Sequence, residues 1–281
     1  MLKAAWRQAE FKAAGGVFAL ILALAVVGPL VIDASATKID VSATFLPPIF
    51  VAGGQLPHFL GTDQLGRDLL LRSLIGLSNA LVISLVSVIG MFLVGCTIGI
   101  VSGFRGGWVD VVLMRLTDVQ MSIPVIILAI TILGLTRPTA LLVIGVLIVA
   151  GWPVYARVAR SVTLAERQKE YVRAAKILGA SDLRVMALHI APSILPPIAF
   201  VAVLDVARMM IFEAIFGFLG IGVHPPTPTF GTIISSGLQY LINAWWITTV
   251  PGAFLAVTLC CINLMGGVLE RVRNQMLRGV E

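Results

Sequence analysis

Three charged residues, Asp205, Arg208 and Glu213, lie within one long apolar stretch of this sequence. Each charge in a hydrocarbon environment costs at least about 3 kcal/mol unless it is paired or hydrated. Asp205 and Arg208 are three residues apart and can meet on one face of a helix, whereas Glu213 is spaced less well for pairing. Two interpretations stay open: these groups line a water-filled path or gate, or they neutralise charges at a seam with a partner subunit.

Two smaller groups of charged residues can likewise each be interpreted in two ways. Asp118 follows Arg115 by three residues, so it either pairs with Arg115 along one helix or faces the same path or seam. Asp63, Arg67 and Asp68 lie in a glycine-containing run between apolar segments. They either contact a solute or a partner, or they build an ordered turn followed by a capped helix.

The sequence has no residue pattern that indicates metal binding, a reactive thiol, ATP hydrolysis or nucleophilic catalysis. The three histidines, His58, His189 and His224, have no metal-ligand spacing, so we expect no metal site. The three cysteines all lie in apolar stretches, where thiols pack as small hydrophobic groups. The pattern G-x-x-x-x-G-K-[ST] and any evident nucleophile–base pair are also missing, so we expect no enzyme activity and no ATP hydrolysis in this chain.

The composition predicts that these residues are positioned by membrane helices. The chain has 281 residues, of which 58% are hydrophobic and 12% charged, and its mean hydropathy is +1.01. Uncharged runs far longer than a barrel strand indicate an all-α integral membrane protein, because membrane-spanning backbone must satisfy its own hydrogen bonds. The net charge of +6 comes from basic residues between the apolar runs, without the aromatic interleaving of a nucleic-acid surface.

The uncharged runs predict six transmembrane helices, each near the roughly 20 residues that cross a bilayer. They are Ala13–Ile32, Ser73–Phe104, Val119–Thr136, Pro138–Ala156, Ser193–Leu219 and Trp245–Leu269. With a cytoplasmic N-terminus, most of the 20 Lys and Arg residues fall inside. Those that fall outside are Lys38, Arg67, Arg72 and Arg137. The positive-inside rule therefore places both termini in the cytoplasm.

One alternative concerns the start of the chain, where Ala34-Ser35-Ala36 follows a basic end and an apolar run, as a signal-peptide cleavage site would. The apolar run is longer than a usual signal-peptide core, which favours an uncleaved span. Cleavage would leave five spans with the later topology unchanged.

Two segments predicted to lie outside connect the spans. The first, Asp33–Arg72, carries Pro47-Pro48 and the charged run described above. The second, Gly220–Ala244, has three prolines and no full charge. Proline at this density stops helices, so we expect both segments to be loops.

A strongly polar block, Glu170–Pro197, interrupts the apolar sequence and reads as a helix, a glycine break and a second helix. Ala174, Ala175 and Gly179 share one flank of the first helix at about 100° per residue. A partner's surface can approach such a small-residue flank closely. The block is therefore either a docking element or an ordinary amphipathic hairpin lying on the membrane surface.

The ends of the two short helices carry recognisable signals. Gly179 is suited to end the first helix in a left-handed conformation, and Ser181 or Asp182 can cap the second. The second helix is expected to run to Pro192, which lacks an amide donor and fits the first turn of the following membrane helix.

Within this block, A-A-x-x-x-G followed by x-I-x-P resembles the cytoplasmic EAA loop of permease subunits of ABC importers. The matching residues are Ala174-Ala175, Gly179 and Ile190-Ala191-Pro192. The general motif has Glu where this chain has Arg173, and Leu where it has Ala191. The first departure is typical of the dipeptide/oligopeptide/nickel branch, whose Y-V-R-A-A-x-x-L-G-A-S string is reproduced by Tyr171 to Ser181.

Two further strings extend the resemblance to this branch, and to its second, C-type permease, over nearly the whole chain. They are Gly61-Thr62-Asp63-x-x-Gly66-Arg67-Asp68 and Phe218-Leu219-Gly220-x-Gly222-Val223-x-Pro225-Pro226-x-Pro228. A late departure is Gly266-Gly267, where Gly-Asp is expected.

The resemblance implies a type I ABC importer permease fold with a cytoplasmic coupling helix. Residues 1–72 would form the N-terminal tail, first span and outside loop, and residues 73–281 a five-helix core with a coupling loop at 157–192. The loop would seat in a groove of an ATPase subunit and pass nucleotide-driven closure to the membrane helices. The loop residues expected to act in this way are Tyr171, Arg173, Ala174, Ala175, Gly179, Ala180, Ser181, Asp182, Ile190 and Pro192.

The resemblance also implies partners. These are a homologous second permease, two cytoplasmic ATPase subunits that use ATP and Mg, and an extracytoplasmic binding protein that Asp63, Arg67 and Asp68 could contact. The chain itself would bind no cofactor and would lie in the bacterial inner membrane. The solute stays open among dipeptides, oligopeptides, nickel, opines and other small solutes. The alternative function is an ion-gradient-driven secondary transporter, for which the charges of 205–213 are the only support.

Overall fold

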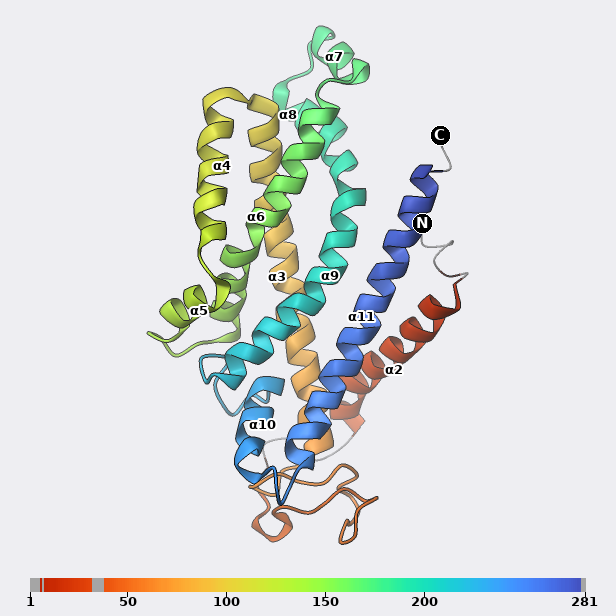
Figure 1. Ribbon diagram of the computed structural model, residues 1–281, viewed down its shortest axis with the longest axis vertical. Helices are drawn as coiled ribbons and strands as arrows, with labels where there is room; N and C mark the ends of the chain where they lie inside the picture. The colour runs from red at the N-terminus through yellow and green to blue at the C-terminus, as the bar shows by residue number, and fades with distance from the viewer. Residues whose placement is uncertain (1–5, 7, 32–37, 279–281) are drawn as a thin grey trace. The chain divides into compact units, whose positions relative to one another are not determined.

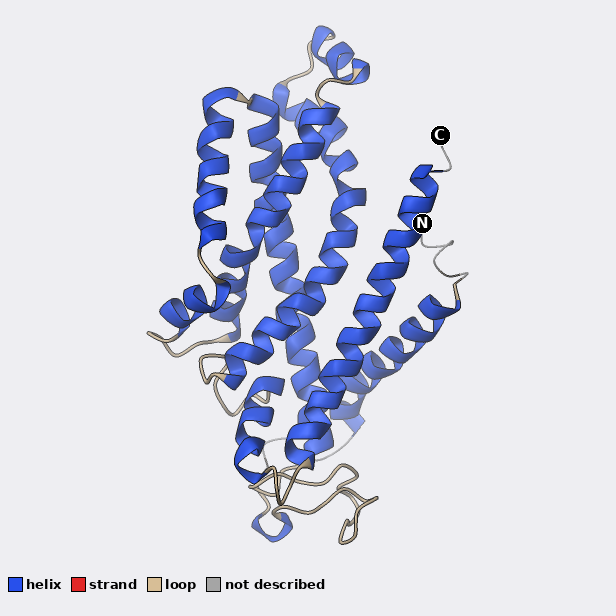
Figure 2. Ribbon diagram, viewed as in Figure 1, coloured by secondary structure: helices blue, strands red, loops and turns tan. Residues whose placement is uncertain are grey.

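The computed structural model describes residue 6, residues 8–31 and residues 38–278, and the tripeptide Ala34-Ser35-Ala36 lies outside them. The described residues form helices and loops, as Figure 2 shows, and their only β-type pairing is an isolated bridge between Thr62 and Asp68. The predicted all-α class is therefore confirmed for this part of the chain.

The helices are of very different lengths. The long ones are α2 (Ala9–Val31), α3 (Leu69–Arg105), α4 (Gly107–Ser122), α6 (Ala140–Glu166), α9 (Ala191–Phe218) and α11 (Trp246–Arg278). The short ones are α5 (Val125–Leu133), α7 (Glu170–Ile177), α8 (Asp182–Val185), α10 (Phe230–Gly237), the 3-10 turns η1 (Val41–Ala43) and η3 (Leu238–Tyr240), and the π-helical turn η2 (Met186–Ile190).

Four described helices, α2, α3, α6 and α11, are long and apolar enough to cross a membrane. A fifth span results if α4 and α5, which are bent by 82° at the break between them, count as one. The predicted single helix Val119–Thr136 is therefore wrong. Pro124 lies at the break, and the preceding residue, Ile123, is extended, as the residue before a proline tends to be.

A second correction concerns the segment 220–244, where the prolines led us to expect a loop. α10 begins inside it, directly after Thr229. The Thr229 hydroxyl accepts a hydrogen bond from the amide of Thr232, and the Thr232 hydroxyl accepts one from the amide of Thr229. This capping box starts a helix only two residues after the last proline of the segment.

The chain forms two compact units, each built from separate stretches of sequence. The first comprises Met1–Ser84, Leu133–Val143 and Val206–Glu281, and the second comprises Leu85–Ile132 and Ile144–Asp205. Four helices contribute residues to both units, namely α3, α6 and α9, and also α5 through its last residue, Leu133.

In the first unit, α2 packs along α11, and the two helices lie side by side in Figure 1. Phe11 of α2 is buried against Val268 and Val272 of α11. Arg271 also donates a hydrogen bond to Glu10 across the same pair of helices. α2 is therefore attached to the last helix of the chain.

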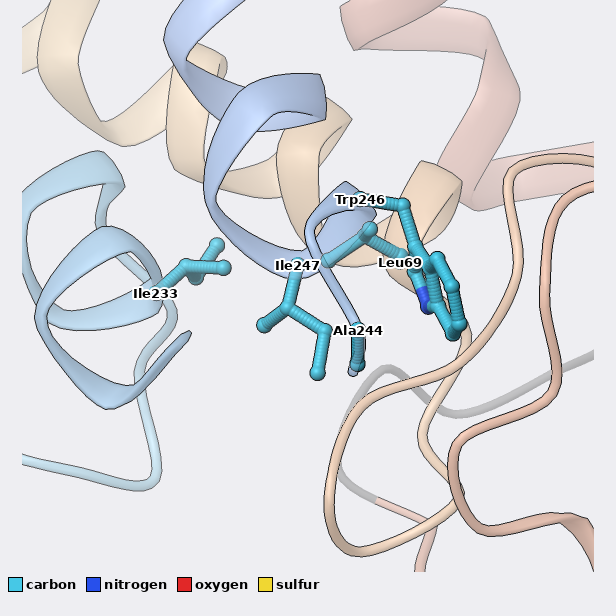
Figure 3. Packing of buried hydrophobic residues seen from close by; sticks show 5 residues of the cluster. All are labelled: Leu69, Ile233, Ala244, Trp246 and Ile247. Carbon is cyan, nitrogen blue, oxygen red and sulfur yellow. The ribbon is translucent and has the colours of Figure 1, made fainter. Parts of the chain in front are cut away.

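A second cluster of the first unit joins the start of α3, α10 and the start of α11. Figure 3 shows its members, Leu69, Ile233, Ala244, Trp246 and Ile247, all of which are buried. The Trp246 indole nitrogen donates to the carbonyl of Thr62 at 3.1 Å. The cluster thereby fixes the 38–68 segment against the helix ends.

In the second unit, α3 and α6 pack closely through three glycines of α3, Gly95, Gly99 and Gly103. A methyl group at Gly99 would lie 2.7 Å from the Cβ of Ala159, and one at Gly103 would lie 2.9 Å from the Cβ of Thr163. Small residues at this spacing let membrane helices approach with their backbones nearly in contact. The close approach gives the second unit a rigid helix pair.

A pair of matched substitutions tests this packing. Gly99→Ala should destabilise the chain by about 1–3 kcal/mol, because the added methyl group overpacks the α3–α6 contact. Gly145→Ala on α6 is the control, since a Cβ there meets nothing within 4 Å and alanine is the better helix former. The measurement is the thermal unfolding midpoint of the purified chain in detergent. Equal midpoints for the two variants would contradict the close contact.

Candidate functional site

The polar block folds as its local signals predict. α7 ends at Ile177 with Leu178 as its C-cap, and the next residue, Gly179, has a φ of +85°. The amide of Gly179 donates to the carbonyl of Lys176, and the amide of Ala180 donates to the carbonyl of Ala175, each at 3.0 Å. These two bonds form a Schellman motif, which needs the left-handed conformation that glycine adopts easily. The left-handed conformation needed to end the helix therefore explains why position 179 is a glycine.

The chain continues from this break into α9 almost without interruption. The Ser181 hydroxyl accepts a hydrogen bond from the amide of Arg184, which confirms the predicted N-cap of α8. The turn η2 follows α8, and α9 starts at Ala191, so Pro192 lies in the first turn of α9 as expected. Ile190 is fully buried. The predicted second helix is therefore a continuous helical segment that extends α9.

α7 has two different sides. Val172, which is 2% exposed, and Lys176, one turn later, face the rest of the second unit. Ala174 and Leu178 each lie two residues from Lys176, which is about 200° around the helix. Ala174 is exposed, and Leu178 is 87% exposed. Ala174 and Leu178 therefore project away from the unit, on the side opposite Val172 and Lys176.

Sequence reasoning missed that the most exposed apolar residues of this block lie around its glycine break. Ile177, Leu178 and Leu183 are 86%, 87% and 73% exposed, although each is a large aliphatic side chain in a polar segment. Apolar surface of this kind marks an interaction site when it is grouped. The signal in the sequence was the Ile-Leu pair directly before Gly179, which we treated only as helix.

The start of α7 is tied to the end of α6 through Glu166. Its carboxylate accepts a hydrogen bond from Lys169 at 2.7 Å and another from the Tyr171 hydroxyl. The bond to Glu166 raises the pKa of Tyr171 above its ordinary value, which keeps the hydroxyl protonated. The Tyr171 ring also stacks on His189 of η2, with centroids 6.2 Å apart. Tyr171 thus links α6 with the segment that leads into α9.

The remaining predicted residues of the block are placed on or near its surface. Arg173 and Asp182 are exposed, whereas Ala175 and Ala180 are partly buried. Lys176 forms an ion pair with Asp182 at 3.2 Å, which joins α7 to α8 across the glycine break. The fold brings these residues together within one short helical hairpin.

The ends of α3, α4 and α6 are locked by a charged cluster that the sequence did not indicate. Arg160 of α6 donates to both carboxylate oxygens of Asp110 on α4, at 2.5 and 2.6 Å. Ser102 of α3 donates to the same carboxylate. Bidentate charge-assisted bonds of this type are among the stronger ones in proteins. These bonds therefore hold the ends of α3, α4 and α6 together, and the hairpin follows the end of α6.

Asp63, Arg67 and Asp68 form a network within the 38–68 segment. Asp63 is buried; it accepts from the side chain of Arg67 at 2.7 Å and lies 3.4 Å from Arg72. Asp68 accepts from the amide of Leu71 at the start of α3, which is the geometry of a helix cap. These contacts favour the interpretation that the run is an ordered turn and a cap.

The predicted charges within the apolar helices are not all paired as expected. Asp118 accepts a hydrogen bond from Arg157 of α6 at 2.7 Å, so the expected pair with Arg115 is wrong. The partner is 39 residues away in sequence, and helical spacing cannot indicate it. On α9, Asp205 and Glu213 are buried, and Arg208 is exposed. The Oε2 atom of Glu213 has no hydrogen-bond partner among the described residues.

No group of three or more His, Cys, Asp or Glu residues in the described ranges has the geometry to hold a metal ion. Of the three cysteines, Cys96 and Cys261 are buried, Cys260 is exposed, and all are free.

Comparison with protein families gives one match. Residues 95–275 match the family described as binding-protein-dependent transport system inner membrane component. The matched range contains the close α3–α6 contact from Gly95 onward, the whole polar block and most of α11.

Curated relatives extend the match over most of the chain. It is 34% identical over 232 residues to the di/tripeptide transport system permease protein DppC of Pseudomonas aeruginosa, covering 83% of this chain and 77% of that protein. It is 31% identical over 265 residues to the dipeptide transport system permease protein DppC of Haemophilus influenzae, covering 94% and 90%.

Among solved structures, the chain is similar to an inward-facing conformation of the MetNI methionine ABC transporter. The TM-score is 0.56 with 20% sequence identity, covering 76% of this chain and 96% of that chain. This likeness supports the predicted fold type. The alternative of a secondary transporter finds no support in the family match or in these relatives.

The network around Asp63 gives a testable prediction. Asp63→Asn should destabilise the 38–68 segment by about 3–5 kcal/mol, because it removes the buried negative charge that faces Arg67 and Arg72. The measurement is the rate of limited proteolysis of this segment in the purified chain.

The matched control is Asp40→Asn in the same segment. Asp40 is exposed and accepts a hydrogen bond from the amide of Ser42 at 3.0 Å, a role that asparagine performs equally well. Asp40→Asn should leave the cleavage rate unchanged. A wild-type rate for Asp63→Asn would show that the network is not structural.

Proposed function

Because the chain belongs to the family of binding-protein-dependent transport system inner membrane components, we propose that it forms half of the translocation path for peptides or related small solutes. It is a multi-pass inner-membrane permease subunit of an ABC importer. The names of its relatives, a di/tripeptide and a dipeptide permease, support a peptide-like solute.

The proposed topology has six spans with both termini in the cytoplasm. α2, α3, α6, α9 and α11 are five of them, and the bent pair of α4 and α5 is the sixth. The basic residues between Arg157 and Arg184 then lie inside, in agreement with the positive-inside rule. Residues 1–72 precede a core of residues 73–281, whose coupling loop is 157–192.

The coupling function rests mainly on one observation, the exposed side of α7. Ala174, Ile177 and Leu178 project from a helix whose other side is anchored to the second unit. A cytoplasmic ATPase subunit seats this side in a groove, where the small Ala174 permits close approach. This chain has no phosphate-binding loop of its own, so ATP and Mg are bound by the ATPase subunits. Two such subunits complete the proposed transporter.

Movement of α7 reaches the membrane helices along two connections. Glu166 joins α7 to the end of α6 through Lys169 and Tyr171. The ion pair of Lys176 with Asp182 joins α7 to α8, which continues through η2 into α9. When ATP draws two coupling loops together, α6 and α9 are displaced, and the path opens outward.

Other partners are assigned to other surfaces. A homologous second permease completes the path, and Arg208, the exposed charge of α9, lies at the seam with it. Asp118, Asp205 and Glu213 are placed along the path or seam. An extracytoplasmic binding protein delivers the solute to the outer loops, including the 38–68 segment that Asp63, Arg67 and Asp68 keep ordered.

The docking role of α7 is tested by Ala174→Glu combined with Leu178→Glu. Burying the added carboxylates in an apolar contact is unfavourable, because they lose their hydration without gaining a partner. Retention of the ATPase subunits by the purified permease should therefore fall at least about tenfold. The second permease should be retained, which shows that the chain is folded. The measurement is the ratio of ATPase to permease after purification in mild detergent.

The control is Val41→Glu, which puts the same charge on a side chain that is 79% exposed in the 38–68 segment. This position is outside in the proposed topology, so ATPase retention should equal that of the wild type. Full ATPase retention and uptake by the doubly substituted permease would refute docking at this side of α7.

A further inference from the structure

The wide turn η2 inserts one residue into the helical segment that leads from α8 into α9. The amide of Ala191 donates to the carbonyl of Met186, five residues back, where an α-helix would use a carbonyl four residues back. Single π-helical turns inside α-helices are frequent at functional sites. Here the turn changes which side chains of α8 face the interior of the second unit.

The residues buried on the two sides of η2 do not follow α-helical spacing. Ile190, Ile194 and Ile198 are at most 1% exposed and recur every four residues, so they form one buried stripe. Val185 is fully buried as well, although it precedes Ile190 by five residues. In an uninterrupted α-helix it would lie about 140° from Ile190. The extra residue of η2 turns Val185 back toward the stripe.

The sequence also fits a second register, in which the segment is α-helical throughout. Met186 and Leu183 precede Ile190 by four and seven residues, which places them about 40° and 20° from it around an α-helix. This spacing is typical of an apolar helix face. In the structure, however, Leu183 is 73% exposed and Met186 is only partly buried. The α-helical register would bury both and turn Val185 outward.

We propose that the segment of α8 and η2 alternates between these two registers during the transport cycle. The observed register buries Val185, and the other closes η2 into an α-helix that buries Leu183 and Met186. The exchange rotates α8 by roughly 100° relative to α9, the angle of one α-helical residue. Because apolar side chains fill the interior in both registers, both are compatible with the same packing. The inference rests on the proposed function, in which closure of the ATPase subunits supplies the force on α8.

The contacts of α8 allow this rotation. Its N-cap is Ser181, whose hydroxyl accepts from the amide of Arg184, so α8 moves together with its own cap. Lys176 and Asp182 join α7 to α8 as an ion pair in which both side chains are about half exposed or more. Exposed ion pairs contribute little stability, so this one can be exchanged during the movement.

A pocket of about 340 Å³ beside η2 gives the turn room to close. The pocket lies within the second unit, between α3 and the start of α9. Its lining includes Phe92, Cys96 and Ile100 of α3, together with Ala187 of η2 and Ala191 of α9. The small alanine side chains face this space, so a change in the path of the turn meets little steric resistance.

A fixed turn that only accommodates Pro192 is the alternative. A proline ring crowds the carbonyl four residues before it, and a wider turn relieves this contact. Pro196 and Pro197, however, lie within α9 without a wide turn. A proline alone therefore does not require η2, and it leaves the α-helical spacing of Leu183 and Met186 without a reason.

The first test follows the accessibility of position 185 in the purified transporter complex. Val185→Cys and its matched control Ile190→Cys, both at fully buried positions, are made in a background whose native cysteines are replaced by serine. A maleimide labels the complex without nucleotide and the complex trapped with ATP, Mg and vanadate. The thiol at position 185 should react at least about fivefold faster in one state than in the other, and the thiol at position 190 should stay protected in both.

Two labelling results would overturn the proposal. Position 185 stays protected in both states, which means that the register does not change. Alternatively, position 190 loses protection together with position 185, which indicates local unfolding of the segment instead of a change of register.

The second test disfavours the register that the structure does not show. Leu183→Gln leaves an exposed position polar in the observed register and buries an amide in the other, so uptake into proteoliposomes should fall at least about fivefold. The ATPase subunits should be retained. The control is Leu188→Gln, because Leu188 is 66% exposed and lies on the outer side in both registers. Its uptake should stay within about twofold of the wild type.

Three uptake results would contradict the two registers. Leu183→Gln transports as the wild type does, or it loses the ATPase subunits along with uptake, which makes Leu183 a docking residue. In the third case, Leu188→Gln lowers uptake equally, which indicates a general need for apolar surface on this segment.

Failure of the proposed function has a different signature. If the complex carrying Ala174→Glu and Leu178→Glu keeps its ATPase subunits while position 185 changes its accessibility, docking at α7 is wrong and the change of register stands. If docking is confirmed and position 185 stays protected in both states, only the change of register is wrong.

Discussion

The close contact between α3 and α6 is the constraint on which the coupling block depends. Gly95, Gly99 and Gly103 remove the side chains that would otherwise separate the two helices. Because the backbones nearly touch, Arg167, which directly follows α6, reaches two carbonyls in the last turn of α3. The base from which α7 starts is therefore fixed by helix packing. A looser contact would leave these bonds out of reach and the hairpin without a defined position.

A fixed base gives α7 two sides with different tasks. Its anchored side, with Val172 and Lys176, closes a basic pocket against the end of α3. Its exposed side, with Ala174 and Leu178, is free for a partner. In the proposed function, force from an ATPase enters on the exposed side and leaves through Glu166 to α6 and through η2 to α9. A short helix can serve as a lever only because both of these connections are present.

The sequence predicted the features that depend on long uncharged runs or on a few neighbouring residues. Uncharged runs located the main apolar helices, and Gly179 and Ser181 marked the end of α7 and the cap of α8, because capping depends on a few neighbouring residues. The 82° break at Pro124 was missed because hydropathy records no change of helix direction. The partner of Asp118 and the anchored side of α7 depend on contacts between distant segments, which spacing within one helix does not reveal.

The most direct test of the central claim maps which side of α7 faces the ATPase. A photoactivatable thiol-linked probe is attached to Leu178→Cys or to Lys176→Cys in the assembled transporter, in a background whose native cysteines are replaced by serine. The proposed docking predicts strong cross-linking to the ATPase from position 178 and little from position 176. Cross-linking from position 176 with none from position 178 would contradict it.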